Sequence, residues 1–133
     1  MKDDNNQFMS YAINLAKQGE GQTAPNPPVG AVLVKNGKII SEGWHKKAGD
    51  AHAEAECLKP FSNPKELKDT ALFVTLEPCS MCLAAIVHSR LQKLIYGLPS
   101  PKYGAFSSNH STFQNLERVV KNTEVYGGFY QSE

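Results

Sequence analysis

One histidine, one glutamate and two cysteines, placed in two short segments, constrain this chain more than any other feature of its sequence. His52-Ala53-Glu54 comes first, and Pro78-Cys79-Ser80-Met81-Cys82 follows. Zinc prefers imidazole and thiolate ligands, and a catalytic zinc site uses three protein ligands and leaves a fourth position open. The fold therefore has to bring the two segments together if His52, Cys79 and Cys82 are to share one metal ion.

Glu54 gives the same cluster a group that can move protons. Two thiolates balance the charge of Zn²⁺, and the metal lowers the pKa of a water molecule in its open position toward neutrality. Glu54 lies two residues from His52, so it can reach that water without binding the metal. We expect Glu54 to be the catalytic residue that takes a proton from the attacking water and delivers it to a leaving group.

Both segments are expected to open helices. Pro78 suits a first helical turn, and the largely apolar residues 79–90 predict a helix with Cys79 and Cys82 on one side of its start. Residues 51–58 predict a second short helix, with His52 at its irregular N-terminal edge. The positive end of a helix favours thiolate over thiol. The metal is therefore expected between two helix N-termini.

Two other uses of the paired cysteines stay open from the residues alone. A C-x-x-C pair that follows a strand and opens a helix is also typical of a redox site. A structural zinc site would need a fourth protein ligand, for which Cys57 is the remaining obvious candidate. Cys57 lies among small and apolar residues, so we expect it in the core. Either alternative would make the chain a non-enzymatic redox or structural zinc module.

The length and charge of the chain bound its class. Its 133 residues suit one domain, residues 1–133, that is large enough to bury a core. A net charge of +1 and a pI near 7.7 give no strong attraction to nucleic acid or membrane. The polar start of the chain predicts neither a signal peptide nor a transmembrane helix. Three cysteines, two of them assigned to metal, favour a reducing cytoplasm over a disulfide framework.

Hydrophobic periodicity predicts alternating helices and strands. Helices are expected at residues 7–18, 51–58, 79–90 and 112–120, and strands at residues 29–34, 38–44, 70–76, 93–97 and 124–126. Asn36-Gly37 predicts a hairpin turn between the first two strands, which would therefore pair antiparallel. The later strands can run parallel through helical crossovers. Together these features predict an α/β fold, a three-layer α/β/α sandwich with a mixed five-stranded sheet.

The two metal-ligand segments resemble those of the cytidine deaminase superfamily of zinc-dependent nucleobase deaminases, over roughly residues 5–128. The N-terminal half, at residues 19–30 and 43–49, is similar to the aminopyrimidine deaminase domain of riboflavin biosynthesis. This resemblance implies that Asn26 and His45 contact the substrate. We place Trp44 and Ala53 with them as substrate-binding residues, although Trp44 could equally be a core aromatic.

The C-terminal half resembles a bacterial tRNA adenosine deaminase instead. Residues 75–82, 84–90 and 96–105 follow that pattern, and the chain lacks the longer insertion that the riboflavin deaminase carries between its two cysteines. A modest basic rim for RNA phosphates could form from Lys46, Lys47, Arg90, Lys93 and Lys102, although scattered surface lysines are the ordinary explanation for such a group.

The resemblance implies a zinc-dependent hydrolytic deaminase, with one zinc ion per chain, that releases ammonia from an amino-substituted nucleobase or nucleotide. We expect its substrate to be a phosphoribosyl aminopyrimidine of riboflavin biosynthesis. The alternatives are the wobble-position adenosine of tRNA and a free base such as guanine or cytosine. The expected partners are therefore a small-molecule substrate or tRNA, no membrane, and further copies of the chain in a homodimer or larger homo-oligomer.

Overall fold

The computed structural model describes residues 2–61, 63–101, 103–106 and 123–128. Its helices are α1 (Lys2–Lys17), α2 (Ala53–Leu58), the short 3₁₀ helix η1 (Pro64–Leu67) and α3 (Ser80–His88). Its strands are β1 (Gly30–Lys35), β2 (Lys38–Trp44), β3 (Thr70–Leu76), β4 (Lys93–Leu98) and β5 (Glu124–Tyr126).

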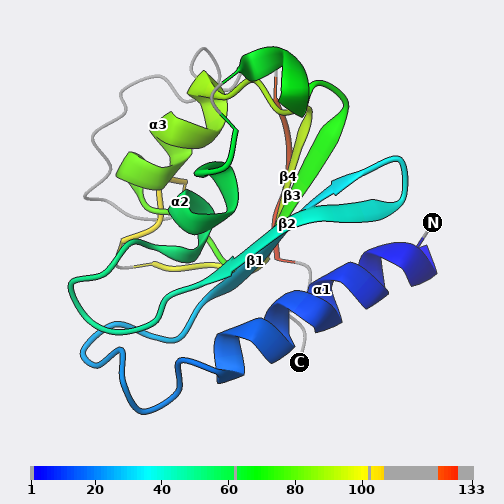
Figure 1. The fold of residues 1–133 in the computed structure, drawn as a ribbon. Coiled ribbons are helices and arrows are strands. Elements are labelled where there is room, and N and C mark those ends of the chain that lie inside the picture. The colour runs from blue at the N-terminus through cyan, green and yellow to red at the C-terminus, as the bar shows by residue number, and fades with distance from the viewer. Residues whose placement is uncertain (1, 62, 102, 107–122, 129–133) are drawn as a thin grey trace.

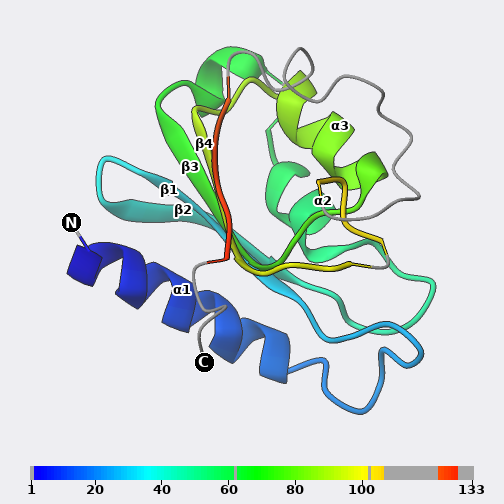
Figure 2. The ribbon, with the colours of Figure 1, turned by 180° about the vertical axis from the view of Figure 1, so that it is seen from behind.

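The described strands form one mixed sheet in the order β2-β1-β3-β4-β5. β1 pairs antiparallel with both β2 and β3, whereas β3 with β4 and β4 with β5 are parallel pairs. Figure 1 shows α1 on one face of the sheet and α2 and α3 on the other, and Figure 2 shows the same arrangement from behind. The predicted three-layer sandwich with a mixed five-stranded sheet is confirmed.

Alternating side chains of the central strands fill two separate cores. In β3, Leu72 and Val74 lie in the core beneath α2 and α3, whereas Phe73 lies in the core beneath α1. Met9 and Leu15 of α1 complete the second core. Successive side chains of a strand point to opposite faces, so a continuous apolar strand is buried on both sides. The helices on both faces are what makes such strands stable.

The elements differ from their predicted bounds mainly at helix ends. β2, β3 and β5 have the predicted bounds, and Asn36 and Gly37 form the hairpin turn with φ values of 53° and 75°. α1 begins at Lys2 rather than at residue 7, because its polar first turn carries no apolar periodicity that would reveal it. α3 begins only at Ser80, because Cys79 has an extended backbone. The predicted helix at residues 112–120 lies outside the described residues.

Gly43 sets how closely α2 approaches the sheet. A Cβ atom at this position in β2 would lie 2.7 Å from the Ala53 carbonyl oxygen and 2.7 Å from Glu56 Cβ. No larger residue fits there unless the helix moves away. The close approach therefore fixes the start of α2, and with it His52, against the edge of the sheet.

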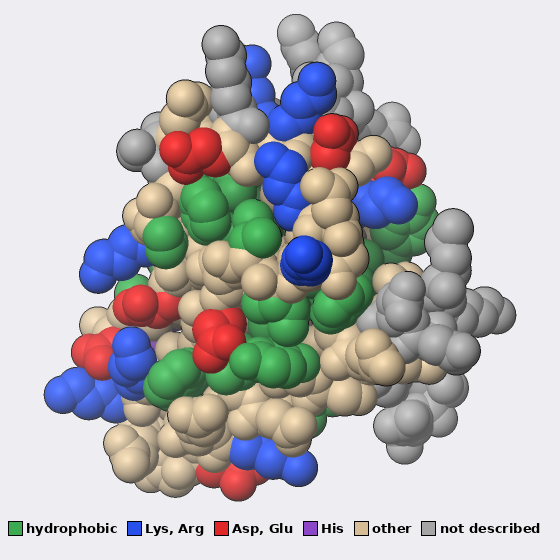
Figure 3. Space-filling view, turned by 45° about the vertical axis from the view of Figure 1, so that its right-hand side comes forward, with side chains coloured by type: hydrophobic (Ala, Val, Ile, Leu, Met, Phe, Trp, Pro, Cys, Tyr) green, Lys and Arg blue, Asp and Glu red, His purple; other side chains and the backbone are tan. Residues whose placement is uncertain are grey.

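The surface seen in Figure 3 carries charged side chains of both signs, with exposed hydrophobic side chains between them. No broad area of a single charge is visible on this face, in keeping with the net charge of +1. Within the described part of the chain, no helix is both long enough and apolar enough to cross a membrane.

Candidate active site

The candidate metal ligands lie at the starts of two helices. His52 is the N-cap residue of α2 (φ −69°, ψ 160°), and Cys79 is the N-cap residue of α3 (φ −73°, ψ 172°). An N-cap residue has an extended backbone, so its side chain lies at the mouth of the helix rather than along its flank. Cys82 follows in the first turn of α3, on the same side as Cys79. The helix ends thus present three candidate ligands toward one point.

The three candidate ligand atoms are close enough to bind one zinc ion. His52 Nδ1 lies 3.2 Å from Cys82 Sγ and 3.9 Å from Cys79 Sγ, and all three atoms lie within 4.8 Å of one another. Ligand bonds of about 2.0–2.3 Å in a tetrahedral site separate such atoms by about 3.5–3.8 Å. The donor types and their spacing therefore fit zinc. Among the described residues, no other group of three His, Cys, Asp or Glu side chains has this geometry.

The two thiols of the cluster differ in their proton affinity. A hydrogen bond from the Cys82 thiol lowers the pKa of Cys79 to about 5, and backbone N–H groups at the helix start act in the same direction. The same hydrogen bond, together with burial, raises the pKa of Cys82. The pair therefore holds one thiolate at neutral pH, and zinc binding has to displace the second proton.

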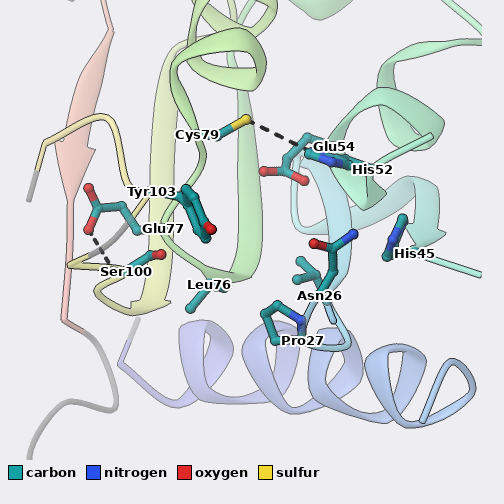
Figure 4. Close-up of a pocket in the computed structure, with 11 residues that line it drawn as sticks. Asn26, Pro27, His45, His52, Glu54, Leu76, Glu77, Cys79, Ser100 and Tyr103 are labelled. Atoms are coloured by element: carbon teal, nitrogen blue, oxygen red, sulfur yellow. Dashed lines mark hydrogen bonds between the residues drawn. The ribbon is translucent and has the colours of Figure 1, made fainter. Parts of the chain in front are cut away.

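Glu54 is a buried carboxylate beside the three ligand atoms. Its side chain is 4% exposed, and Figure 4 shows it pointing into the pocket next to His52 and Cys79. Burial raises the pKa of Glu54 to about 7, and the negative charge of Cys79 acts in the same direction. A carboxyl group with a pKa near neutrality can both accept and donate a proton at physiological pH.

A cavity of about 270 Å³ opens in front of this cluster. Its lining comes from the loop before β1, the segment after β2, the starts of α2 and α3, the end of β3 and the loop after β4. The lining residues are Asn26, Pro27, Val29, His45, His52, Glu54, Leu76, Glu77, Cys79, Ser100 and Tyr103. Figure 4 shows Asn26 and His45 on one side and Glu77, Ser100 and Tyr103 on the other. None of the described residues lining this cavity is Lys or Arg.

His45 lines the cavity and has a buried ring nitrogen without a hydrogen-bond partner among the described residues. Its Nδ1 lies 3.1 Å from the Ala51 carbonyl oxygen, which can only accept a hydrogen bond, so Nδ1 carries the proton. Nε2 of the neutral ring is then an acceptor, and it is buried without a partner among the described residues. The backbone of Asn26, on the same side of the cavity, is held by two hydrogen bonds of 2.7 Å with Thr23. Both residues are placed to meet a ligand.

The family model for the cytidine and deoxycytidylate deaminase zinc-binding region matches residues 2–98, which include both metal-ligand segments. The chain belongs to this family. It is a zinc-dependent deaminase, an enzyme that hydrolyses a C–N bond of a small-molecule substrate, and the resemblance inferred from its sequence is confirmed.

The similar proteins include both of the types that the sequence motifs resemble, riboflavin-biosynthesis deaminases and a tRNA adenosine deaminase. The diaminohydroxyphosphoribosylamino-pyrimidine deaminase of Buchnera aphidicola subsp. Acyrthosiphon pisum is 43% identical over 137 residues, which cover 93% of this chain and 92% of that protein. RibD from Acinetobacter baumannii matches with a TM-score of 0.82 and 31% identity, over 99% of this chain and 37% of that one. A solved tRNA:A34 deaminase matches with a TM-score of 0.71 and 30% identity, over 94% of this chain and 99% of that one.

The deaminase spans only part of several of its relatives. It covers 26–36% of the length of the longer riboflavin biosynthesis proteins that it matches. The similarity to those proteins therefore concerns their deaminase portion, and not the activities of their remaining length.

Two residues that the sequence placed at the substrate site lie elsewhere in this deaminase. Trp44 packs against the core beneath α1, and the Lys46 Nζ atom lies 5.2 Å from its ring centroid. Trp44 and His45 are neighbours on extended backbone, so their side chains point to opposite faces, and His45 takes the pocket side. Ala53 is fully buried in the other core and does not line the cavity. Neither residue lines the cavity, and the contact of these two residues with the substrate stays a prediction.

Cys57 does not join the metal cluster. Its Sγ donates a hydrogen bond to the Ala31 carbonyl oxygen over 3.2 Å, and burial raises the pKa of Cys57 to about 12. It belongs to the apolar core beneath α2. The alternative of a structural zinc site thereby loses its proposed fourth ligand.

The sequence reasoning missed six residues that line the cavity, and three of them carry polar side chains: Glu77, Ser100 and Tyr103. One signal could have found Glu77. It is a charged residue directly after the buried strand β3, at the carboxyl end of the parallel strands β3 and β4, where ligand sites of α/β folds gather. Ser100 and Tyr103 lie in an irregular loop, and only the fold shows that this loop returns to the pocket.

Proposed function

We propose that this chain deaminates a phosphoribosyl aminopyrimidine of riboflavin biosynthesis, with His52, Cys79 and Cys82 as the zinc ligands and Glu54 as the catalytic residue. A deaminase of that named type is 43% identical over nearly the whole chain. The proposal extends the family's shared chemistry to one substrate class.

The single observation that carries the substrate class is the state of His45. His45 lines the cavity, and its buried Nε2 atom is an acceptor that has no partner among the described residues. A buried acceptor left without a hydrogen bond costs about 1–3 kcal/mol, so the site favours a ligand that donates there. An aminopyrimidine offers N–H donors around its ring. His45 and Asn26 also lie in the stretches that resemble the riboflavin deaminase.

Zinc, when bound, supplies a Lewis acid that makes water nucleophilic near neutral pH. Glu54 accepts a proton from the attacking water as that water adds to the amino-bearing carbon of the ring. Glu54 passes this proton to the ring nitrogen beside that carbon, takes the second proton from the added hydroxyl group and delivers it to the amino nitrogen. The C–N bond then breaks, and ammonia leaves while the ring carbon becomes a carbonyl. A pKa of about 7 suits both halves of this proton transfer. Asn26 and His45 hold the ring so that its amino group faces Glu54.

The same proposal includes the setting in which the enzyme works. Residues 1–133 form one deaminase domain. All three cysteines are free thiols, which fits a cytoplasmic location. We also propose a homodimer or larger homo-oligomer, which the resemblance of the sequence implies.

An ammonia-release panel tests the substrate. The zinc-loaded protein is given the phosphoribosyl diaminopyrimidinone, its dephosphorylated form, an anticodon stem-loop with adenosine at the wobble position, cytidine, dCMP, guanine and adenine. We expect the diaminopyrimidinone to be turned over with the highest kcat/KM. The dephosphorylated form should retain much of this activity, because no lysine or arginine is found among the described cavity residues. Turnover of cytidine, dCMP or a free base in preference would overturn the proposal.

A tRNA adenosine deaminase is the second candidate. It is favoured by the short spacing of Cys79 and Cys82 and by the 30% identity to a tRNA:A34 deaminase over almost the full length of both chains. Phosphate contacts from positive side chains supply much of the affinity for RNA. The face in Figure 3 carries charges of both signs, which favours the first candidate over this one. Turnover of the stem-loop alone, with KM rising steeply as salt is added, would replace the first candidate with this one.

A further inference from the structure

Glu77 holds a loop of the pocket with both oxygens of its carboxylate. The side chain is 3% exposed. Oε1 accepts a hydrogen bond of 3.0 Å from the Ser100 backbone N–H, and Oε2 accepts one of 2.7 Å from the Phe106 backbone N–H. The two donors lie at opposite ends of the segment 100–106, so one carboxylate closes this loop on itself.

The backbone of Gly104 packs directly against this carboxylate. A Cβ atom on Gly104 would collide with the Glu77 carboxylate. Gly104 also forms an isolated bridge with Cys79, and the Ala105 N–H donates to the Pro78 carbonyl oxygen over 2.9 Å. The loop is therefore fastened to the segment that carries a candidate zinc ligand.

The fastened loop forms one side of the cavity. Ser100 and Tyr103 line it, on the side opposite Asn26 and His45 (Figure 4). In the same view the Glu77 carboxylate points toward Ser100 and away from His52. Glu77 therefore helps to set the shape of the cavity, whereas Glu54 is placed to transfer protons.

We propose that Glu77 is a positioning residue for substrate binding, which fixes residues 100–106 as the second side of the pocket. The proposal rests on the proposed function for its substrate. A glutamate is required because a carboxylate offers acceptors on both oxygens, whereas the amide of glutamine replaces one acceptor with a donor that would face a backbone N–H. The loop is released at one end when that bond is lost.

Steady-state kinetics of Glu77→Gln with the best substrate of the ammonia-release panel test this role. We expect KM to rise about tenfold or more, since hydrogen bonds to charged groups are strong, while kcat stays within about threefold and zinc remains at one per chain. Gly104→Ala should raise KM similarly, and the double variant should be far from additive, because both changes displace the same contact. Glu42→Gln is the matched control, because its carboxylate accepts a 2.7 Å hydrogen bond from Tyr11 on the exposed surface.

Amide hydrogen exchange separates this proposal from the proposed function. In Glu77→Gln, exchange should speed up in residues 100–106 and stay unchanged in β1, whether or not a substrate is known. Unchanged exchange in that loop overturns the proposal even if the enzyme deaminates as expected. A loss of kcat without a change in KM also overturns it, because Glu77 would then act on the chemistry. If the unaltered enzyme turns over nothing in the panel, the proposed function fails, and the exchange result alone decides whether Glu77 holds the loop.

Discussion

The two faces of the sheet bury different kinds of side chain. Beneath α1, the core consists of apolar residues: Met9, Leu15, Val32, Val34, Phe73 and Ile95. The opposite face buries aliphatic residues as well, but next to them it buries His45, Glu54 and Glu77, and the two candidate zinc thiols lie there too. A buried carboxyl group destabilises a fold unless it is hydrogen-bonded or protonated. The core beneath α1 therefore contributes stability alone, whereas the face beneath α2 and α3 also carries the buried groups that can take part in chemistry.

The comparison predicts that loss of zinc lowers the stability of the fold, and that only changes on the face beneath α2 and α3 affect zinc binding. Replacing Cys82 by Ala should remove zinc and lower stability, because the binding energy of a zinc site, about 10 kcal/mol or more in small zinc domains, contributes to folding. Zinc per chain and the midpoint of thermal unfolding measure the two effects. Cys57→Ala is the matched control and should keep one zinc per chain, because Cys57 donates to Ala31 instead. Loss of zinc from Cys57→Ala would restore the structural-site alternative.

Phe73→Ala tests the first face by itself. Phe73 is 2% exposed and packs against Phe8 of α1, with ring centroids 5.4 Å apart. Its truncation should lower the free energy of unfolding by about 3–5 kcal/mol, because such a cavity is not refilled. Zinc content and KM, measured below the new unfolding temperature, should not change. A folded Phe73→Ala protein with altered KM would show that the two faces are not independent.

The smallest effect concerns thiol reactivity after zinc has been removed by a chelator. Because its pKa is lowered to about 5, Cys79 is a thiolate at pH 7, and its alkylation should slow only as the pH falls through 5. Cys57, with a pKa raised to about 12, should stay unreactive over the same range. Mass spectrometry of the alkylated peptides measures both rates. Equal labelling of the two cysteines, or a Cys79 midpoint near the ordinary thiol value, would contradict the described hydrogen bonding.

The sequence predicted the sheet well because its central strands are buried on both faces. The continuous apolar run of β3 places that strand without error, whereas β2, which is mostly exposed or half-buried, is placed by the Asn36-Gly37 turn before it. The paired cysteines place the start of α3 to within one residue. The same local patterns indicated which residues can share a metal. They needed no knowledge of distant contacts.

Contacts across the fold explain what was missed. Strand alternation alone should have separated Trp44 from His45, since adjacent residues of a strand point to opposite faces. The role of Glu77 could not be found in this way. Its partners are backbone N–H groups of a loop more than twenty residues further along the chain, and backbone donors carry no sequence signal. The side-chain contacts on the face beneath α2 and α3 are thus harder to predict from sequence than the apolar packing beneath α1.

Turnover and zinc content of Glu54→Gln test the central claim most directly. Glutamine keeps the size of the side chain but cannot carry the proton, so ammonia release should fall by about 10²–10⁴-fold while one zinc per chain remains. Glu56→Gln, two residues along the same helix, should keep activity, because its carboxylate lies 3.9 Å from Lys46 outside the pocket. A Glu54→Gln protein that retains zinc and full activity would contradict the assignment of Glu54 as the group that moves the proton.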